Sequence, residues 1–254
     1  MQKPEGGHLL IRKILRDSVL SLLIGCTVSF LVYTTAGDLL AESPADAVSR
    51  WSRARVVSKR VLALDATVAA ALGEMDLEPK DIVEWHMDDP ESNLRKLWQM
   101  KPADQKNASV IALYIIHQNR NIDAETVWRQ AVSFVHYSKK YDVPLTLAVA
   151  VANTESHFNP DARSSYGAAG VMQVVWRIHS DLLKVHGGIR SERDLHDPEK
   201  GIAAGTLLLS RYLQAYGSTQ RALGRYYGGP VENYWPKVSR NINRVVSYGL
   251  EPGI

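Results

Sequence analysis

One glutamate stands where a carboxyl group could act as an acid. Glu155 follows a largely apolar, alanine-rich stretch over 144–152, whose composition predicts a helix. A carboxyl group at the end of such a helix lies against apolar walls, and loss of water there favours the neutral form and raises the pKa. General-acid catalysis requires an acid that is still protonated near neutral pH. Taken alone, a glutamate at a helix end is more often a cap or a surface residue, so the segments around it decide its interpretation.

The segment after Glu155 is rich in glycine and alanine and could approach a ligand. Gly167 and Gly170 allow close approach of the backbone or a positive φ. Gln173 can offer a donor and an acceptor to a sugar hydroxyl or amide. Met172 can offer a flexible apolar surface to a sugar face. The residue types therefore favour a carbohydrate site beside the acid.

Four blocks in this half of the chain follow one another in a characteristic order. They are 155–160 (Glu-Ser, then Phe-Asn-Pro), 170–173 (Gly-Val-Met-Gln), 197–202 with the helical pattern after it, and 225–230 (Arg-Tyr-Tyr-Gly-Gly-Pro). A tail containing Glu232, Tyr234, Lys237 and Val238 follows. In order and spacing these blocks resemble the soluble lytic transglycosylases, the family-1 lysozyme-like domains that cleave peptidoglycan. The resemblance covers residues 142–246.

The resemblance implies a fold, a reaction and a set of site residues. The fold would be all-α or mainly α and lysozyme-like, and the reaction would cleave the bond between N-acetylmuramic acid and N-acetylglucosamine with formation of a 1,6-anhydro sugar. Glu155 would be the single general acid and base. Ser156 would assist it or a sugar, Met172 and Gln173 would line the glycan groove with their backbone, and Tyr226 would hydrogen-bond or pack near Glu155. No cofactor and no metal are implied.

Three departures from the family pattern fall beside the implied cleft. Tyr227 stands where asparagine is usual, Arg225 stands where a small residue is common, and Val175-Trp176 replaces a proline. These positions bear on sugar contacts and substrate preference, not on the acid itself. Tyr227 also keeps open the alternative of a non-catalytic peptidoglycan-binding scaffold. A hydrolytic muramidase is a second alternative and needs a second carboxylate, but Asp161, the next acid downstream, is expected in a loop.

Other chemistries find little support in the composition. Cys26 is the only cysteine, which excludes an intramolecular disulfide and a cysteine-based metal site. His179, His186 and His196 are seven and ten residues apart, which fits no metal pair on a helix, and we expect them at the surface. A net charge of +3 does not predict a nucleic-acid partner.

The N-terminal region has the pattern of a membrane anchor. Residues 18–36 carry no charged side chain and follow Arg12, Lys13 and Arg16. Such a run is long enough to cross a bilayer, and the basic flank favours a cytoplasmic N-terminus. We therefore predict a cytoplasmic basic segment over 1–17, a transmembrane helix over 18–36, and the remainder on the periplasmic side of the inner membrane. A cleaved signal peptide and a lipoprotein modified at Cys26 are the alternatives.

The segment between the anchor and the resemblance predicts a helical module over 43–130, before a catalytic domain over 131–254. An apolar stripe from Val57 to Met75 predicts one long amphipathic helix after Ser43-Pro44, ended by Gly73 and Pro79. Shorter helices are predicted around 92–100 and 108–119, and a longer one is capped by Asp123. The tryptophans of the module are expected in the core. The expected partners are peptidoglycan strands, the membrane and cell-envelope machinery such as a secretion apparatus.

Overall fold

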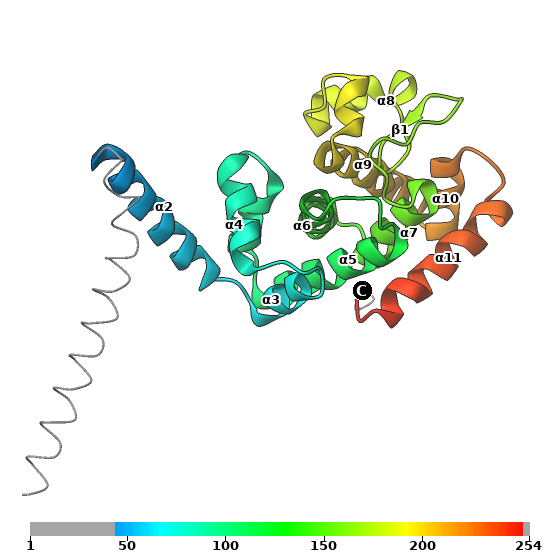
Figure 1. Cartoon of the computed structure of the whole chain (residues 1–254). Coiled ribbons are helices and arrows are strands. Elements are labelled where there is room, and N and C mark those ends of the chain that lie inside the picture. The colour runs from blue at the N-terminus through cyan, green and yellow to red at the C-terminus, as the bar shows by residue number, and fades with distance from the viewer. Residues whose placement is uncertain (1–43, 251–254) are drawn as a thin grey trace, which may run out of the picture. The chain divides into compact units, whose positions relative to one another are not determined.

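The computed structural model describes residues 44–250 (Figure 1). The predicted segments 1–17 and 18–36 lie outside these residues. In the part that is described, no helix has both the length and the apolar character needed to cross a membrane. Residues 57–250 belong to one compact unit, and residues 44–56 belong to another. Trp51, in the second of these, is 75% exposed, so the expectation that it lies in a core is wrong.

The predicted long helix is two helices, α2 (Pro44–Val61) and α3 (Ala66–Gly73). The helical conformation is interrupted before Asp65, whose backbone is extended. The Asp65 side chain accepts a hydrogen bond from the Thr67 amide at 2.9 Å. The Asp65 amide in turn donates to Gln105 Oε1 at 2.7 Å. An aspartate that caps a helix satisfies amides that lack an intrahelical partner, so it starts a new helix here. The expectation of one uninterrupted helix is corrected accordingly.

Four helical elements follow α3. They are α4 (Pro79–Asp88), the 3₁₀ helix η1 (Asn93–Gln99), α5 (Pro102–Gln118) and α6 (Ala124–Tyr141). Pro79, expected to end a helix, instead begins α4, because proline is well tolerated in the first helical turn. The Asp123 side chain caps α6 as predicted, accepting from the Thr126 amide at 2.8 Å. Trp85 and Trp98 pack against the core, also as predicted.

The second half is helical apart from one short hairpin. Helix α7 (Leu145–Ser156) precedes strands β1 (Ala168–Ala169) and β2 (Val174–Val175), which pair antiparallel with Ala168 opposite Val175. The remaining elements are α8 (Trp176–Leu182), the π-helical η2 (Leu183–Gly187), the 3₁₀ helix η3 (Glu192–His196), α9 (Pro198–Tyr216), α10 (Thr219–Tyr227) and α11 (Val231–Ser247). The described chain is therefore mainly α, as predicted.

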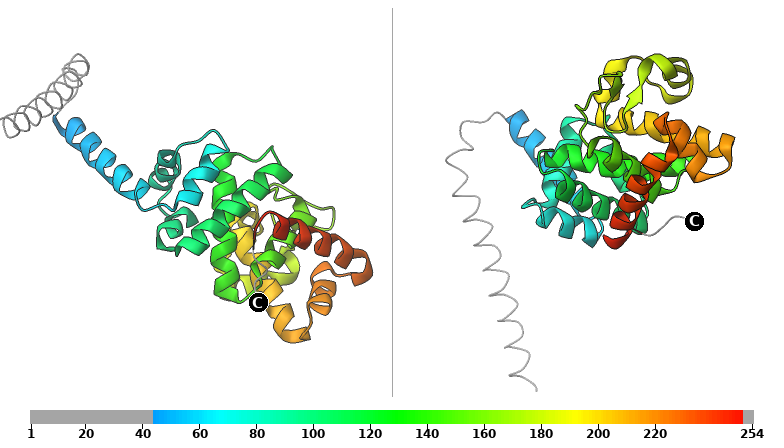
Figure 2. Two further views of the ribbon diagram at one scale, coloured as in Figure 1. Left: turned by 90° about the horizontal axis from the view of Figure 1, so that it is seen from below. Right: turned by 90° about the vertical axis from the view of Figure 1, so that its right-hand side faces the viewer.

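Helix α6 lies at the centre of the unit formed by residues 57–250. It packs against α5 and α9, while α7 packs against α11, and α10 packs against both α9 and α11 (Figure 2). The fully buried Trp128 and Phe134 of α6 and Tyr114 of α5 belong to a core that is continuous from α3 to α11. The predicted boundary at residue 131 falls inside α6.

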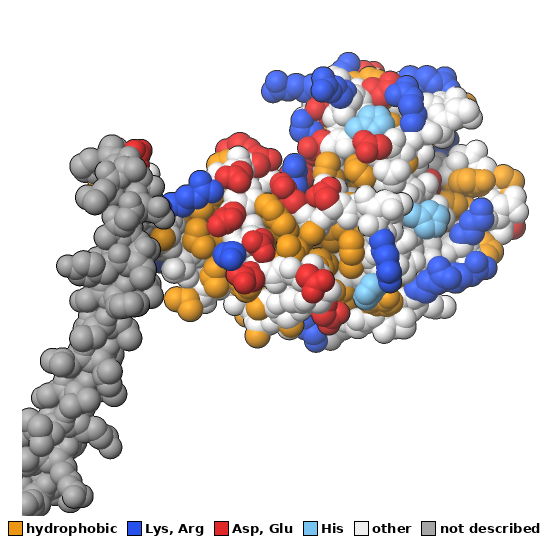
Figure 3. Space-filling view, viewed as in Figure 1, with side chains coloured by type: hydrophobic (Ala, Val, Ile, Leu, Met, Phe, Trp, Pro, Cys, Tyr) orange, Lys and Arg blue, Asp and Glu red, His pale blue; other side chains and the backbone are white. Residues whose placement is uncertain are grey.

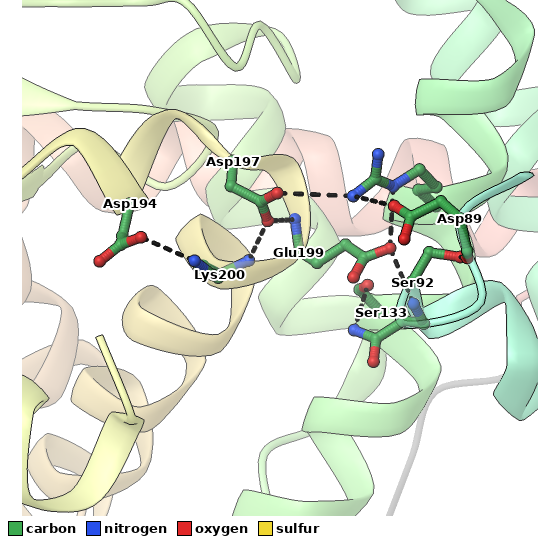
Figure 4. A network of polar contacts seen from close by, with 9 residues as sticks. Asp89, Ser92, Ser133, Asp194, Asp197, Glu199 and Lys200 are labelled. Carbon is green, nitrogen blue, oxygen red and sulfur yellow. Dashed lines mark hydrogen bonds and ion pairs between the residues drawn. The ribbon is translucent and has the colours of Figure 1, made fainter. Parts of the chain in front are cut away.

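A polar network joins α6 to α9 and to the segment between α4 and η1 (Figure 4). Arg129 Nε donates to Glu199 Oε1 at 2.9 Å, and the Asn93 amide donates to the same oxygen at 2.9 Å. Arg129 also pairs with Asp197, the N-cap of α9, at 3.4 Å and with Asp89 at 3.8 Å. Burial raises the pKa of Glu199, and the Arg129 charge opposes that shift.

Candidate active site

Glu155 lies in the last turn of helix α7. Every residue from Thr146 to Asn153 is buried, so the helix is surrounded by packed side chains for most of its length. It ends because His157 adopts a left-handed conformation, with φ of 51°. The helix that the sequence predicts before Glu155 is confirmed. Glu155 is thus fixed by a rigid, buried element and not by a loop.

Glu155 lines a cleft of about 620 Å³. The cleft lies between α7, the segment of the hairpin, α8, α9 and α10, and the surface of the molecule is hollowed between the hairpin and α10 (Figure 3). Its lining residues are Glu155, Ser164, Tyr166, Ala168, Gln173, Val175, Ile178, His179, Tyr212, Arg225, Tyr226, Tyr227, Gly228, Gly229 and Pro230. Within the described residues, Glu155 is the only acid of this lining.

The carboxyl group of Glu155 is held by a tyrosine from the end of the chain. Tyr234 of α11 is 3% exposed, and its hydroxyl donates to Glu155 Oε1 at 2.5 Å. Sequence reasoning included Tyr234 in the tail of the resemblance but gave it no role. The signal available was its place in a segment that continues the family pattern. Its contact with Glu155 spans 79 residues of sequence and appears only in the folded chain.

Burial raises the pKa of Glu155 from 4.5 to about 7. The hydrogen bond from Tyr234 and the positive charge of Lys237 both lower the pKa, but their effect is smaller than that of burial. A carboxyl group with this pKa is partly protonated at neutral pH, so it can donate a proton and later accept one. These are the electrostatics that the sequence analysis expected at this position.

Tyr226 and Ser156 both hold the turn between β1 and β2. The Tyr226 hydroxyl donates to the Met172 carbonyl at 2.7 Å, and Ser156 Oγ donates to the Val171 carbonyl at 2.7 Å. Tyr226 lines the cleft with Glu155, and the Glu155 charge adds to burial in raising the Tyr226 pKa. Tyr226 therefore lies beside Glu155, whereas the Ser156 hydroxyl is occupied by a backbone carbonyl.

Met172 requires a correction. Its side chain is fully buried, and it does not line the cleft. It packs against α9 at Gly205, where an added Cβ would overlap the Met172 side chain. The side chain therefore belongs to the core, and only the backbone of Met172 takes part in the site, as the acceptor for Tyr226.

Gln173 reaches the cleft in a constrained conformation. Its φ is 48°, and its Nε2 donates to the Ala162 and Gly170 carbonyls, each at 3.0 Å. The amide nitrogen is thus occupied by the backbone. We expected Gln173 to offer both a donor and an acceptor to a ligand, but only the acceptor Oε1 remains available.

The three histidines occupy different environments. His186 is exposed, as expected. His179 is half-buried in the wall of the cleft, where burial and the nearby Arg225 charge lower its pKa, so the expectation of a surface position is wrong. His196 Nδ1 lies 2.9 Å from the Pro160 carbonyl oxygen. Over the described part of the chain, no group of three or more histidine, cysteine, aspartate or glutamate residues could hold a metal ion.

Three of the residues that depart from the family pattern also line the cleft, namely Val175, Arg225 and Tyr227. The Tyr227 ring stacks on the Tyr234 ring, with centroids 4.7 Å apart and planes 7° apart. The Arg225 guanidinium lies 6.0 Å from the centre of the Tyr212 ring. The fourth, Trp176, begins α8, and its ring lies 5.5 Å from Lys184 Nζ.

A half-buried carboxyl group at a cleft of a mainly helical unit is the arrangement that a lysozyme-like domain would have. More closely, residues 133–242 match the transglycosylase SLT domain. Every sequence block singled out above from Glu155 through Tyr234 falls within this range.

Individual proteins are similar to part of the chain. The chain is 42% identical over 94 residues to "Membrane-bound lytic murein transglycosylase C" of Yersinia enterocolitica and over 92 residues to that of Yersinia pestis. Each match spans 35% of this chain and 26% of the relative, so the chain corresponds to about a quarter of the length of these proteins. The 70 kDa soluble lytic transglycosylase of Escherichia coli aligns with 64% of this chain and 29% of its own, at 21% identity and a TM-score of 0.38.

Proposed function

We propose that the protein is a peptidoglycan lytic transglycosylase that cleaves the β-1,4 bond between N-acetylmuramic acid and N-acetylglucosamine. One observation carries the proposal. Glu155 is a half-buried acid with a pKa of about 7, and it faces a cleft that has no other acid among its described lining residues. The SLT domain over 133–242 supports the same substrate class.

The proposed reaction uses Glu155 twice and consumes no water. Glu155 first donates its proton to the glycosidic oxygen while the bond from that oxygen to the muramyl anomeric carbon breaks. The carboxylate then takes the proton of the muramyl 6-hydroxyl as that oxygen bonds to the anomeric carbon. The products are a 1,6-anhydromuramyl end and a free 4-hydroxyl. The acetamido group of the substrate stabilises the intermediate, and Glu155 ends in its starting protonation state.

The other site residues act by position in this proposal. Tyr234 orients the Glu155 carboxyl group through the bond to Oε1. Tyr226 and Ser156 fix the backbone of 171–172 at the edge of the cleft. Gln173 presents its remaining acceptor to a sugar, and Met172 contributes its backbone alone. These roles concern placement of the substrate and of the acid, since Glu155 alone transfers the proton.

A hydrolytic mechanism would require a second carboxylate. Glycosidases of that kind hold two carboxyl groups about 5–5.5 Å or about 6.5–9.5 Å apart. Asp161 is exposed, and it does not belong to the cleft lining. The Asp161 backbone amide donates to Asn159 Oδ1 at 2.9 Å, a contact within the loop that holds Asp161. The arrangement therefore favours internal attack by the substrate's own hydroxyl.

The proposed location is the periplasmic face of the inner membrane. The two Yersinia relatives named above are called membrane-bound, and the sequence of 18–36 predicts an anchor of the kind that such a location needs. An anchored enzyme would act on wall strands close to the membrane, where it would serve wall remodelling or open a passage for envelope machinery.

The test is a digestion of purified sacculi by the full chain, with products identified by mass spectrometry. We expect 1,6-anhydromuramyl ends from the wild type and none from Glu155→Gln. Reducing ends in place of anhydro ends would refute the transglycosylase reaction and indicate a hydrolase. Sacculus binding without any product would refute enzymatic activity and indicate a scaffold.

A further inference from the structure

The cleft holds a cation that has no acid beside it. Arg225, in the last turn of α10, lines the cleft and makes no ion pair with any acid among residues 44–250. The other cleft residue with a charge is Glu155, whose burial disfavours the charged form. A neighbouring cation of the hairpin segment, Arg163, is by contrast paired with Glu192 at 2.6 Å. Arg225 thus gives the cleft a positive charge that the protein itself does not neutralise.

Arg225 is positioned by a row of aromatic rings that leads to Glu155. Its guanidinium lies 6.0 Å from the centre of the Tyr212 ring, near the limit for a cation–π contact. Tyr212 meets Tyr226 edge-on at 6.4 Å, and Tyr226 lies close enough to Glu155 for the Glu155 charge to affect its titration. The rings of Tyr212 and Tyr226 therefore lie between the guanidinium and the acid, and both charged groups line the same cleft.

A guanidinium group in this position is suited to a carboxylate. Its planar N–H groups match the two oxygens of a carboxylate and form charge-assisted hydrogen bonds with them. An unsubstituted N-acetylglucosamine ring offers no anionic group. A muramyl ring carries a lactyl group that ends either in a free carboxylate or in a peptide, and stem peptides carry carboxylates of their own.

We propose that Arg225 binds a carboxylate carried by the muramyl side of the strand and so makes the cleft selective for anionic glycan. This inference rests on the proposed function and adds a specificity determinant to it. Arg225 stands where the family pattern commonly has a small residue, so the preference would be a property of this chain and not of the domain as such. The carboxylate is either the lactyl group itself or a group of the stem peptide.

The expected effect is moderate because Arg225 is exposed. An ion pair at an exposed site contributes little, whereas a charge-assisted bidentate pair contributes more. A pair of intermediate strength corresponds to about a threefold to tenfold preference for an anionic strand over a neutral one. The preference should fall as salt is added, because salt screens exposed charges.

The experiment compares four strand preparations as substrates of the full chain in mild detergent. They are strands with intact peptides, peptide-bearing strands with amidated carboxyl groups, strands stripped to the lactyl carboxylate, and stripped strands with that carboxylate amidated. The variants are Arg225→Ala and Arg225→Lys. Arg221→Ala is the matched control, since Arg221 lies one turn earlier on α10 and lines a different hollow. Rates of cleavage are measured, and binding is measured separately in a Glu155→Gln background.

We expect the wild type and Arg221→Ala to bind and cleave one of the two anionic strands better than its amidated counterpart. A preference among the peptide-bearing strands would identify a stem-peptide carboxylate, and a preference among the stripped strands would identify the lactyl carboxylate. Arg225→Ala should lose that preference, and Arg225→Lys should retain part of it. Equal treatment of anionic and amidated strands by the wild type would overturn the proposal. An equal loss on all four strands in Arg225→Ala would also overturn it, because it would indicate a packing role beside Tyr212. Absence of cleavage by the wild type refutes the proposed function, while the binding comparison still decides the role of Arg225.

Discussion

Replacement of Glu155 by glutamine should make the fold more stable at alkaline pH. The carboxyl group has a pKa of about 7 in the folded chain against 4.5 as its ordinary value. The folded state therefore holds this proton more tightly than the unfolded state does. Stability that depends on the neutral acid is fully present below about pH 4.5 and is lost as the pH rises through 7. Glutamine stays neutral and fills the same space, so the variant escapes the loss.

The size of the effect follows from the two pKa values. At about 1.4 kcal/mol for each tenfold change in proton affinity, the difference between 4.5 and about 7 corresponds to about 3 kcal/mol. The advantage of Glu155→Gln over the wild type should thus be about 3 kcal/mol larger at pH 8 than at pH 4.5. Tyr234 can still donate to the glutamine oxygen, so the hydrogen bond of the site is retained.

The assay is urea unfolding of the full chain at the two pH values, followed by tryptophan fluorescence with Trp128 as a fully buried reporter. Glu232→Gln is the control, because it removes one exposed acid from α11 and leaves the cleft acid in place. Parallel pH dependence in the wild type and in Glu155→Gln would contradict the reasoning. Such a result would mean that Glu155 is solvated in the folded chain and that burial does not govern its protonation.

Two further predictions concern the partner of the acid and the turn beside it. Tyr234→Phe should move the alkaline limb of the kcat/KM profile to higher pH, because the hydrogen bond that is lost lowers the pKa of Glu155 in the wild type. Tyr226→Phe should leave the limb in place, because the Tyr226 hydroxyl donates to a backbone carbonyl and not to Glu155. A shift common to both variants would contradict the assignment. Gly170→Ala should cost at least about 3 kcal/mol in unfolding experiments, because its Cβ would overlap a backbone carbonyl at a positive φ, whereas Gly188→Ala, with a positive φ and open space, should cost about 1 kcal/mol. Equal losses would show that φ alone sets the cost.

The position of the acid could be predicted because its causes are local. An apolar helix over 145–156 and the residues directly after it determine where Glu155 lies and how dry its surroundings are. The partner of the acid could not be predicted, since Tyr234 reaches Glu155 only once α11 packs on α7. The role of Met172 was mistaken for a similar reason. Its burial depends on the absence of a side chain at Gly205, on a helix that follows later in the chain.

The break between α2 and α3 shows how tertiary structure can override a regular pattern. The apolar residues on both sides of the break face the same core. Val61, before the break, packs against the core, and Val68, after the break, is buried in it. Periodicity alone therefore predicts one helix. The break is set by the capping side chain of Asp65 and by the hydrogen bond that the Asp65 backbone amide donates to Gln105 Oε1, forty positions away. A contact of that range leaves no trace in local hydrophobicity.

The network around Glu199 has a consequence for how this catalytic unit can be recombined with other proteins. The SLT match begins at residue 133, but Arg129 and Asn93, which bind the Glu199 carboxylate, both precede it. A chimera joined at the edge of the match would import α9 with a buried carboxylate and without its counter-ion, and an uncompensated buried charge is strongly destabilising. Any lineage that exchanges the segment before residue 133 must therefore supply a substitute cation, so the two parts are expected to be inherited together.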